Sequence, residues 1–293
     1  MSELSEFFAS VSITVDKKLE EVFAEQKTSA SERLDEAIRW SIFAGGKRFR
    51  PALIFASGRT FGVDEAKLSR TAAAVEMVHT YSLIHDDLPA MDDDDIRRGR
   101  ETCHKKFGEA TAILAGDALQ ALAFEVISKD ETLAVEIRLK LIAELSEAAG
   151  KMVIGQQLDL SAEGKEVTPS GVSEIHACKT GALITFSARA GALIAGLDES
   201  RMTGITHYGA RLGLLFQISD DILDVTESSD ILGKTAAKDV SANKATYPSV
   251  YGLDESRELL QKVYRNTLDA LEMFDVPTDH LAELAHYVKN RRS

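Results

Sequence analysis

Helical periodicity runs through almost the whole chain and restricts it to one fold class. Segments such as TAAAVEMVHTYSLI and ITHYGARLGLLFQISDDILDV are apolar around much of a helical circumference. Only five prolines occur in 293 residues, and Ala, Leu, Glu and Lys are abundant, which favours helices over strands. Because helices of this kind belong in the centre of a bundle, the chain is predicted to be all-α.

The predicted helices are separated by short connections that contain Gly, Pro, Asp or Ser, such as AGGKRFRP, SAEGKEVTPSG and GLDES. No alternating strand, internal repeat or low-complexity linker is evident. We therefore expect residues 1–293 to form a single-domain helical bundle. The predicted helices cover 3–26, 30–44, 51–61, 64–88, 109–128, 131–161, 171–196, 201–227, 253–273 and 278–290.

Bulk properties exclude several classes of protein. The net charge of −13 argues against nucleic acid, which needs a broad basic surface. Two cysteines are too few for a disulfide framework or a structural zinc site and indicate a reducing compartment. The first 20 residues do not resemble a signal peptide, and no run of about 18 apolar residues predicts a membrane span. We expect a soluble, cytoplasmic protein.

The segment HDDLPAMDDDDIRRGR, residues 85–100, places six aspartates in the ten positions 86–95. Helical spacing puts His79, Ser82 and Asp86 on one stripe, and Pro89 is expected to end the helix. The widened turn that follows can still direct Asp86 and Asp92 to one point. Converging carboxylates are costly unless a cation neutralises them, and Mg²⁺ prefers such oxygen ligands. A solvated acidic loop is the alternative.

A second acidic group, in FQISDDILDVTES, weakens that alternative. Asp220, Asp221 and Asp224 lie inside an apolar helical stretch, and Asp220 and Asp224 share a helix face on which Gln217 lies one turn earlier. Like charges four residues apart destabilise an isolated helix, and local rules tend to fail at functional positions. Two such groups predict two walls of one metal site.

Basic residues suited to phosphate accompany both groups, although each alone is typical of a protein surface. No Walker loop is present. Arginine binds phosphate as a bidentate fork and lysine as a point charge, so together these bases predict a site for more than one polyanion. The set comprises Lys47, Arg48, Arg50, Arg97, Arg98, Lys179, Lys234 and Lys244.

These motifs resemble those of the short-chain trans-prenyl diphosphate synthases, and most closely the bacterial farnesyl type. The similarity covers nearly the whole chain, in the order GGKRFRP, VHTYSLIHDDLPAMDDDDIRRGR, KFGEATAILAGDALQ, GQQLDL, KTGALI, FQISDDILD, LGKT and KATYPS. The resemblance implies an all-α bundle around a deep central cavity, a homodimer, and about three Mg²⁺ ions per active site, for which Mn²⁺ can substitute.

The resemblance also implies a role for each matching position. Magnesium ligands would be Asp86, Asp87 and Asp92 in the first motif and Asp220, Asp221 and Asp224 in the second. The isopentenyl diphosphate site would comprise Lys47, Arg50, His79 and Arg98. The allylic diphosphate site would comprise Arg97, Lys179, Thr180, Gln217 and Lys234, with weaker cases for Lys244, Arg291 and Arg292.

The implied reaction is a Mg²⁺-dependent head-to-tail condensation through an allylic carbocation, which fixed cations and dipoles would stabilise. Tyr81 lies about 7.5 Å along the helix from Asp86, and with Ser82 it is expected to form the floor that stops the product at fifteen carbons. Ordinary core packing of Tyr81 is the alternative.

Competing functions remain open at this point. Synthases of the same class stop at ten carbons or extend to twenty, and a terpene cyclase uses similar metal chemistry without a second diphosphate site. A non-catalytic interaction subunit and an HD-type phosphohydrolase based on His85-Asp86 are further alternatives. His176, His207, His280 and His286 are expected to be structural or surface residues, and Cys103-His104 is expected to be local packing.

Overall fold

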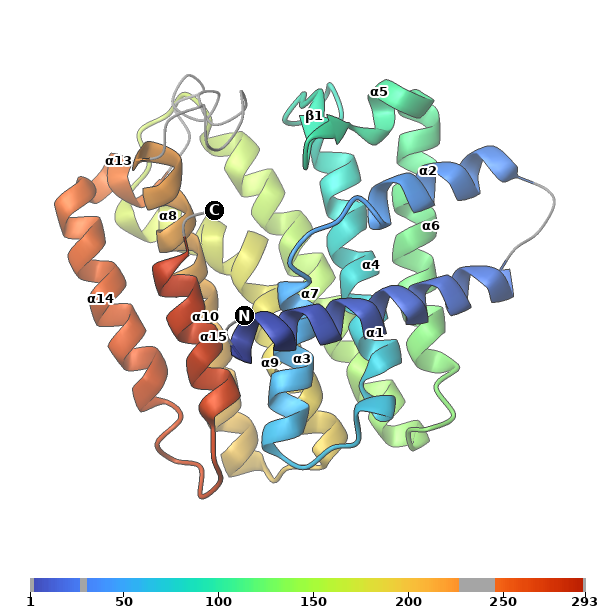
Figure 1. Cartoon of the computed structure of the whole chain (residues 1–293). Helices are drawn as coiled ribbons and strands as arrows, with labels where there is room; N and C mark the ends of the chain where they lie inside the picture. Colours follow the sequence, from blue (N-terminus) through green and yellow to red (C-terminus); the bar gives the residue numbers. More distant parts are fainter. Residues whose placement is uncertain (1–2, 27–30, 227–245, 292–293) are drawn as a thin grey trace. The chain divides into compact units, whose positions relative to one another are not determined.

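The computed structural model describes residues 3–26, 31–226 and 246–291, and these are almost entirely helical (Figure 1). Within these ranges the only strands are β1 (Ile96–Arg97) and β2 (Arg100–Glu101), a short antiparallel hairpin in which Ile96 pairs with Glu101. The prediction of an all-α fold is confirmed.

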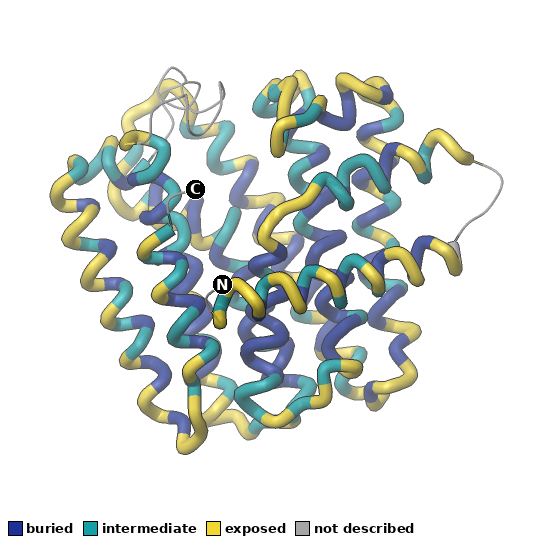
Figure 2. Tube along the Cα trace, viewed as in Figure 1, coloured by how far each residue is buried: buried dark blue, intermediate teal, exposed yellow. Residues whose placement is uncertain are grey.

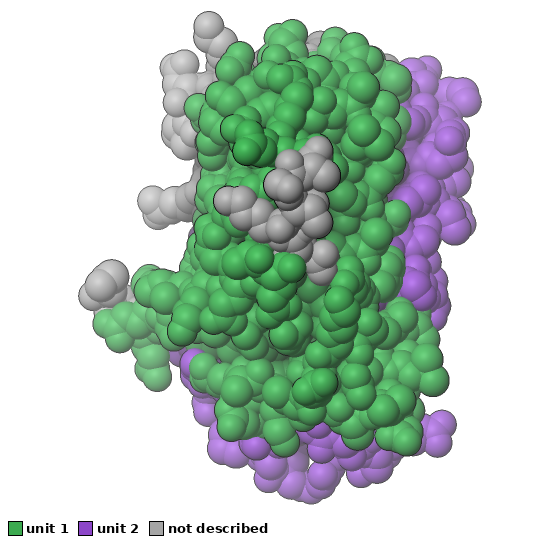
Figure 3. Space-filling view, turned by 90° about the vertical axis from the view of Figure 1, so that its right-hand side faces the viewer, with its two compact units in different colours: residues 1–55, 63–143 green, residues 56–62, 144–293 purple. Residues whose placement is uncertain are grey.

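The chain divides into two compact units, which are coloured separately in Figure 3. Unit 1 comprises residues 1–55 and 63–143, and unit 2 comprises residues 56–62 and 144–293. Two of the three boundaries between the units fall inside continuous helices, α3 (Phe49–Thr60) and α7 (Val135–Ala162), and the third follows α3 after residue 62. A single domain around a deep central cavity stays a prediction.

Unit 1 is built around α4 (Ser69–Asp86), which is buried along most of its length (Figure 2). A run of three alanines, residues 72–74, keeps α4 narrow, so that its neighbours pack closely against it. These neighbours are α1 (Glu3–Gln26), α2 (Glu32–Ile42) and α6 (Glu109–Ser128), and the remaining helices are η1 (Glu65–Lys67) and α5 (Cys103–Phe107).

Unit 2 is built around α10 (Glu199–Thr226), whose buried residues recur at helical spacing from Gly204 to Ile222. It packs against α9 (Ala182–Ala195), α14 (Leu253–Asp269) and α15 (Asp279–Asn290). The other elements are α8 (Pro169–His176), the π-helical segment η2 (Ala177–Gly181) and α13 (Tyr247–Tyr251).

Most predicted helices match the structure within a few residues, and the differences have local causes. The helix predicted over 171–196 is three elements, because residues 177–181 adopt π-helical hydrogen bonding between α8 and α9. Helix α4 ends at Asp86, before Pro89, as the proline requires. The hairpin, α5 and α13 were not predicted, because five residues or fewer carry too little periodicity.

Helix α6 is, by length and composition, the one described helix that is apolar enough to cross a membrane. This differs from the expectation that no segment would meet that test. However, α6 carries Asp117 and Glu125 and packs against α4, α2 and α5 within unit 1. Core helices of globular proteins share this composition, so the finding is weak evidence for a span.

Candidate active site

The first aspartate group lies where α4 ends and the chain turns back on itself. The amide of Asp92 donates to the carbonyl of Asp86 across 2.8 Å, and the amide of Asp94 donates to the carbonyl of Asp87 across 3.2 Å. Asp93 adopts a left-handed φ of 51° in this turn. The widened turn therefore brings the backbones of Asp86 and Asp92 together, although six residues separate them in sequence.

Asp87 differs from its neighbours because it points into the protein. Only 3% of the residue is exposed, and its Oδ1 accepts a 2.6 Å hydrogen bond from Nε of Arg97. Burial raises the pKa of Asp87 to about 7, while Arg97 acts in the opposite direction. The carboxylate thus holds Arg97, on strand β1, against the end of α4.

The bases predicted for isopentenyl diphosphate gather in the same unit. Arg98, with a left-handed φ of 53°, donates from Nη1 to the carbonyl of Gly45, which links the hairpin to the GGKRFRP loop. Gly46 of this loop adopts a φ of 122°, a backbone conformation that L side chains rarely adopt, which favours glycine at this position. Burial and the charges of Arg50 and Arg98 lower the pKa of His79 well below its usual range, so its imidazole is neutral near pH 7.

Two adjacent bases of the same loop have different surroundings. Lys47 is exposed, whereas Arg48 is 3% exposed and donates to Asp16, to Glu76 and to the carbonyl of Ile42. All of these hydrogen bonds lie within unit 1. The interpretation of Arg48 as a phosphate-binding residue is therefore wrong, because its guanidinium is used in holding α1, α4 and the loop together.

Tyr81 and Ser82, the predicted floor residues, lie on α4 one to two turns before Asp86. Tyr81 is 5% exposed and its ring approaches His85 edge-on at 5.9 Å. Burial raises the pKa of Tyr81, with a smaller opposing effect from Gln120 on α6. The hydroxyl of Ser82 donates to the carbonyl of His79.

The second aspartate group lies in the last turns of α10, and its three members differ. Asp220 has a side chain 45% exposed that accepts a 2.8 Å hydrogen bond from Nη2 of Arg291. Asp224 is partly buried. Asp221 is 2% exposed, and both of its oxygens accept hydrogen bonds from the protein.

Three residues predicted for the allylic site are joined through the π-helical segment η2. Thr180 donates to Oε1 of Gln217 across 2.9 Å, and Nε2 of Gln217 donates to Oδ1 of Asp221 across 2.7 Å. Lys179 pairs with Asp159 of α7 at 2.6 Å. π-helical turns are rare and are frequent at functional sites.

Glycines on the neighbouring helices allow η2 to lie this close. A Cβ at Gly155 of α7 would lie 2.2 Å from the amide nitrogen of Lys179, and a Cβ at Gly213 of α10 would lie 2.8 Å from Cα of Gly181. Asp159 itself was not singled out in the sequence, although it stands in the GQQLDL motif four residues after Gly155. Lys234, Lys244 and Arg292 lie outside the described residues.

The donor atoms at the first group fit a hard divalent cation, because they are carboxylates concentrated around one turn. Asp93 and Asp95 of the same loop and His104 of α5 bring potential ligand atoms to within 4.8 Å of one another, an arrangement also compatible with a divalent ion. Lys105 pairs with Asp95 at 3.0 Å and reduces the charge of that group.

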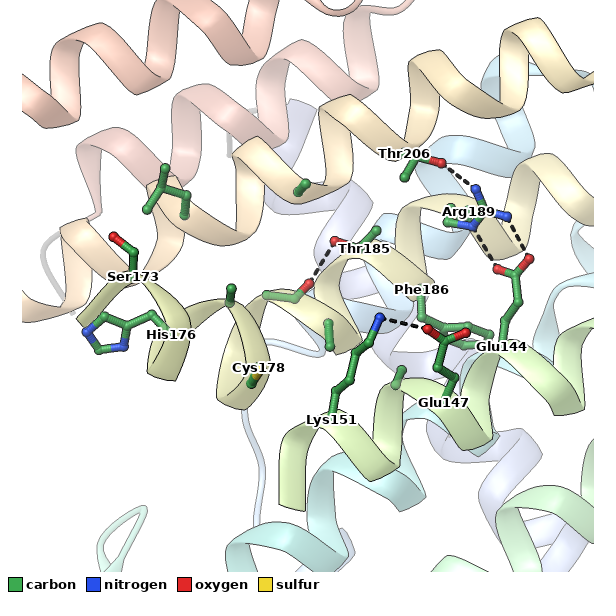
Figure 4. Close-up of a pocket in the computed structure, with 16 residues that line it drawn as sticks. Glu144, Glu147, Lys151, Ser173, His176, Cys178, Thr185, Phe186, Arg189 and Thr206 are labelled. Atoms are coloured by element: carbon green, nitrogen blue, oxygen red, sulfur yellow. Dashed lines mark hydrogen bonds and ion pairs between the residues drawn. The ribbon is translucent and has the colours of Figure 1, made fainter. Parts of the chain in front are cut away.

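A cavity of about 720 Å³ lies within unit 2, lined by residues of α7, α8, η2, α9 and α10 (Figure 4). Its charged residues pair with one another: Arg189 donates to both oxygens of Glu144, and Lys151 pairs with Glu147. Of the predicted site residues that the structure describes, none lines this cavity.

The family model of the polyprenyl synthetases matches residues 31–275. The chain belongs to the polyprenyl synthetase family. The prediction from sequence motifs is therefore confirmed, and the chain is a prenyltransferase of all-α fold.

Individual members of the polyprenyl synthetase family agree along the full length. The farnesyl diphosphate synthase of Haemophilus influenzae is 41% identical, with 100% of both chains covered. Geranylgeranyl pyrophosphate synthase 12 of Arabidopsis thaliana is 47% identical over 89% of this chain and 74% of its own. A crystal structure of a putative farnesyl-diphosphate synthase from Marinomonas sp. MED121 superimposes with a TM-score of 0.85 at 38% identity, covering 99% of this chain and 100% of that one.

Proposed function

We propose that this protein is a farnesyl diphosphate synthase, which condenses isopentenyl diphosphate head-to-tail with dimethylallyl and then geranyl diphosphate and releases diphosphate. The observation that carries this proposal is the turn in which the Asp92 amide binds the Asp86 carbonyl, directly before the arginine pair Arg97 and Arg98. Carboxylates for metal and guanidinium groups for phosphate thus lie within one short segment. The full-length similarity to a bacterial farnesyl diphosphate synthase supports the same substrates.

Of the six acids predicted as metal ligands, the four that are not buried bind the metal. Asp86 and Asp92 hold Mg²⁺ from the first group, and Asp220 and Asp224 from the second, with about three ions bound and Mn²⁺ able to substitute. When bound, Mg²⁺ neutralises the charge of the allylic diphosphate and polarises its carbon–oxygen bond. Asp87 and Asp221, although counted as ligands in the sequence prediction, are held by protein donors and contribute by charge and position.

Two sets of basic and polar residues bind the two diphosphates. Lys47, Arg50, His79 and Arg98 bind isopentenyl diphosphate, and the neutral imidazole of His79 donates a hydrogen bond without adding charge. The allylic diphosphate is bound by Arg97, Lys179, Thr180, Gln217, Lys234 and Lys244. Two of these residues are held in place by protein carboxylates before substrate arrives: Asp87 holds Arg97, and Asp159 holds Lys179.

The chemistry needs no protein nucleophile. The allylic carbon–oxygen bond breaks, and both electrons leave with the diphosphate. The double bond of isopentenyl diphosphate forms the new carbon–carbon bond with the resulting cation, and the adjacent carbon loses a proton to the departing diphosphate. The Thr180 hydroxyl donates a hydrogen bond to the side-chain oxygen of Gln217, and the dipoles of these two groups stabilise the cation.

Tyr81 limits the product to fifteen carbons, with Ser82 beside it. A buried aromatic ring on α4, next to the helix end that carries Asp86, is suited to closing an apolar channel. Extension to twenty carbons is the second candidate, because a geranylgeranyl synthase is 47% identical to this chain.

The protein acts as a cytoplasmic homodimer, without a membrane span and without nucleic acid as a partner. Exposed apolar residues support the dimer: Ile113 and Leu114 on α6 are 44% and 57% exposed, and Val135 and Leu139 in the following helix are 63% and 66% exposed. Apolar side chains of this exposure are typical of surfaces that a second copy covers.

The test is incubation of the purified protein with Mg²⁺, isopentenyl diphosphate and labelled dimethylallyl or geranyl diphosphate. Chromatography of the dephosphorylated products should show farnesol. Geranylgeraniol would favour the longer-chain synthase, a cyclic hydrocarbon would favour a terpene cyclase, and no product would contradict the proposal.

A further inference from the structure

Asp221 is the most enclosed acid of the second group, and three residues approach its carboxylate. Oδ1 accepts from Nε2 of Gln217 at 2.7 Å, and Oδ2 accepts from the amide of Tyr247 at 2.8 Å. The third is His176, whose Nε2 lies 3.3 Å from the same Oδ2. With a residue exposure of 2%, this carboxylate is satisfied by the protein itself.

His176 is also buried, although slightly more exposed than Asp221. It is 8% exposed and is the last residue of α8, directly before the π-helical segment η2. Its ring stacks on that of Tyr247, with centroids 5.4 Å apart and planes inclined by 21°. Among the described residues neither ring nitrogen makes a hydrogen bond of regular geometry, and Nε2 lies within ion-pair distance of Asp221, at 3.3 Å from Oδ2.

Tyr247 completes the enclosure of this pair. Its amide is bound to Asp221, and its hydroxyl lies 3.4 Å from the hydroxyl of Ser173 on α8. The side chain of Thr246 caps the short helix α13 that Tyr247 begins. Three elements, α8, α10 and α13, therefore meet at one buried carboxylate.

A chain of contacts leads from this carboxylate to the proposed allylic site. Asp221 holds Gln217, and the other end of the Gln217 amide accepts from Thr180 at 2.9 Å. If the Asp221 carboxylate were not held in place by its donors, it would no longer fix the amide of Gln217. The amide could then rotate, and Thr180 would lose its acceptor. His176 is also covalently joined to η2, so its position sets the start of the segment that carries Lys179 and Thr180.

We propose that His176 is a positioning residue for the allylic diphosphate site: it fixes Asp221, which orients the Gln217 amide and, through it, Thr180. This inference rests on the proposed function. It reverses the expectation that His176 is a purely structural or surface residue, and it assigns Asp221 to positioning and not to metal coordination. Residues that orient a ligand-binding side chain commonly change affinity or activity by about 10- to 100-fold when they are removed.

The test is steady-state kinetics on three His176 variants. His176→Ala should raise KM for the allylic diphosphate and lower kcat, together by about 10- to 100-fold in kcat/KM, while KM for isopentenyl diphosphate changes less than about twofold. His176→Asn and His176→Gln retain an N–H donor, and at least one should recover much of the loss. The matched control is His207→Ala, an exposed histidine on α10, which should behave like the wild type.

Mg²⁺ titrations separate positioning from metal binding. Asp220→Asn should raise the Mg²⁺ concentration needed for half-maximal rate, whereas Asp221→Asn should lower kcat and leave that concentration near the wild-type value. Equal increases in both variants would overturn the assignment of Asp221. His176 would have only a structural role if every His176 variant showed a higher KM for both substrates and a lower thermal stability, and if neither His176→Asn nor His176→Gln recovered activity. Absence of turnover in the wild type would instead contradict the proposed function itself.

Discussion

Nη2 of Arg291, at the end of α15, donates to the carboxylate of Asp220 across 2.8 Å. The same guanidinium donates to the carbonyl of Phe216 and stacks on the Phe216 ring at 3.8 Å. The guanidinium of Arg291 therefore pairs with Asp220, the carboxylate that is proposed to hold Mg²⁺ from the second group. Arg291 and the metal compete for one carboxylate, since both neutralise it.

Arg291→Gln should therefore lower the Mg²⁺ concentration for half-maximal rate by up to about fivefold, because Asp220 is 45% exposed and such a pair is worth up to about 1 kcal/mol. Initial rates over a Mg²⁺ series measure this. Lys289→Gln is the matched control, because Lys289 is a cation of the same helix that stacks on Tyr264 and not on the aspartate group. An unchanged or higher Mg²⁺ requirement in Arg291→Gln would contradict the competition.

Removal of one acid from each group tests the metal sites directly. Asp86→Ala and Asp220→Ala should each reduce turnover by orders of magnitude, because charge on the departing diphosphate is no longer neutralised. Far-UV circular dichroism should be unchanged, since both side chains are partly solvent-exposed. Near-normal turnover in either variant would exclude that acid as a ligand.

The raised pKa of Asp87 predicts a pH dependence of stability in the metal-free protein. An acid whose pKa is higher when folded (about 7) than when unfolded (3.8) binds more protons in the folded state. The free energy of unfolding then falls as pH rises from about 4 to about 7, by up to about 4 kcal/mol. Urea unfolding in EDTA across this range measures the slope. Asp87→Asn should remove this contribution, and an identical slope in the variant would disprove it.

Lys47 and Arg48 should separate binding from stability. Arg48→Ala leaves the buried Glu76 without its partner and should lower the free energy of unfolding by about 3–5 kcal/mol. Lys47→Ala should leave stability within about 0.5 kcal/mol and raise KM for isopentenyl diphosphate. Chemical denaturation and steady-state kinetics on both variants make the comparison. The reverse pattern would show that the two roles are exchanged.

Tyr81→Ala should lengthen the product, because truncation of the ring opens the proposed floor. Chromatography of the alcohols should show twenty-carbon or longer chains at the expense of farnesol. Ser82→Ala, which removes only a hydroxyl bonded to the carbonyl of His79, should shift the profile less. An unchanged profile for Tyr81→Ala would leave the ring as ordinary core packing.

The amino-acid sequence alone determined the fold class, the family and the residue types of the site. Periodicity over long helices is a local property, and Pro89 ends α4 wherever the helix packs. The two aspartate groups were visible because they break helix rules in plain sequence. Short elements such as η2 and α13 were not predicted from the sequence, because they depend on contacts made with α10 and α8.

Only the tertiary structure decided which polar side chains face protein and which face solvent. Arg48 follows Lys47, Asp87 follows Asp86 and Asp221 follows Asp220, yet in each pair the first residue is accessible and the second is buried. The two residues of each pair are of the same chemical type and belong to the same motif, but successive side chains on a helix or turn point in different directions. The partner that satisfies each buried charge comes from a distant segment: Glu76 for Arg48, Arg97 for Asp87, and Tyr247 for Asp221.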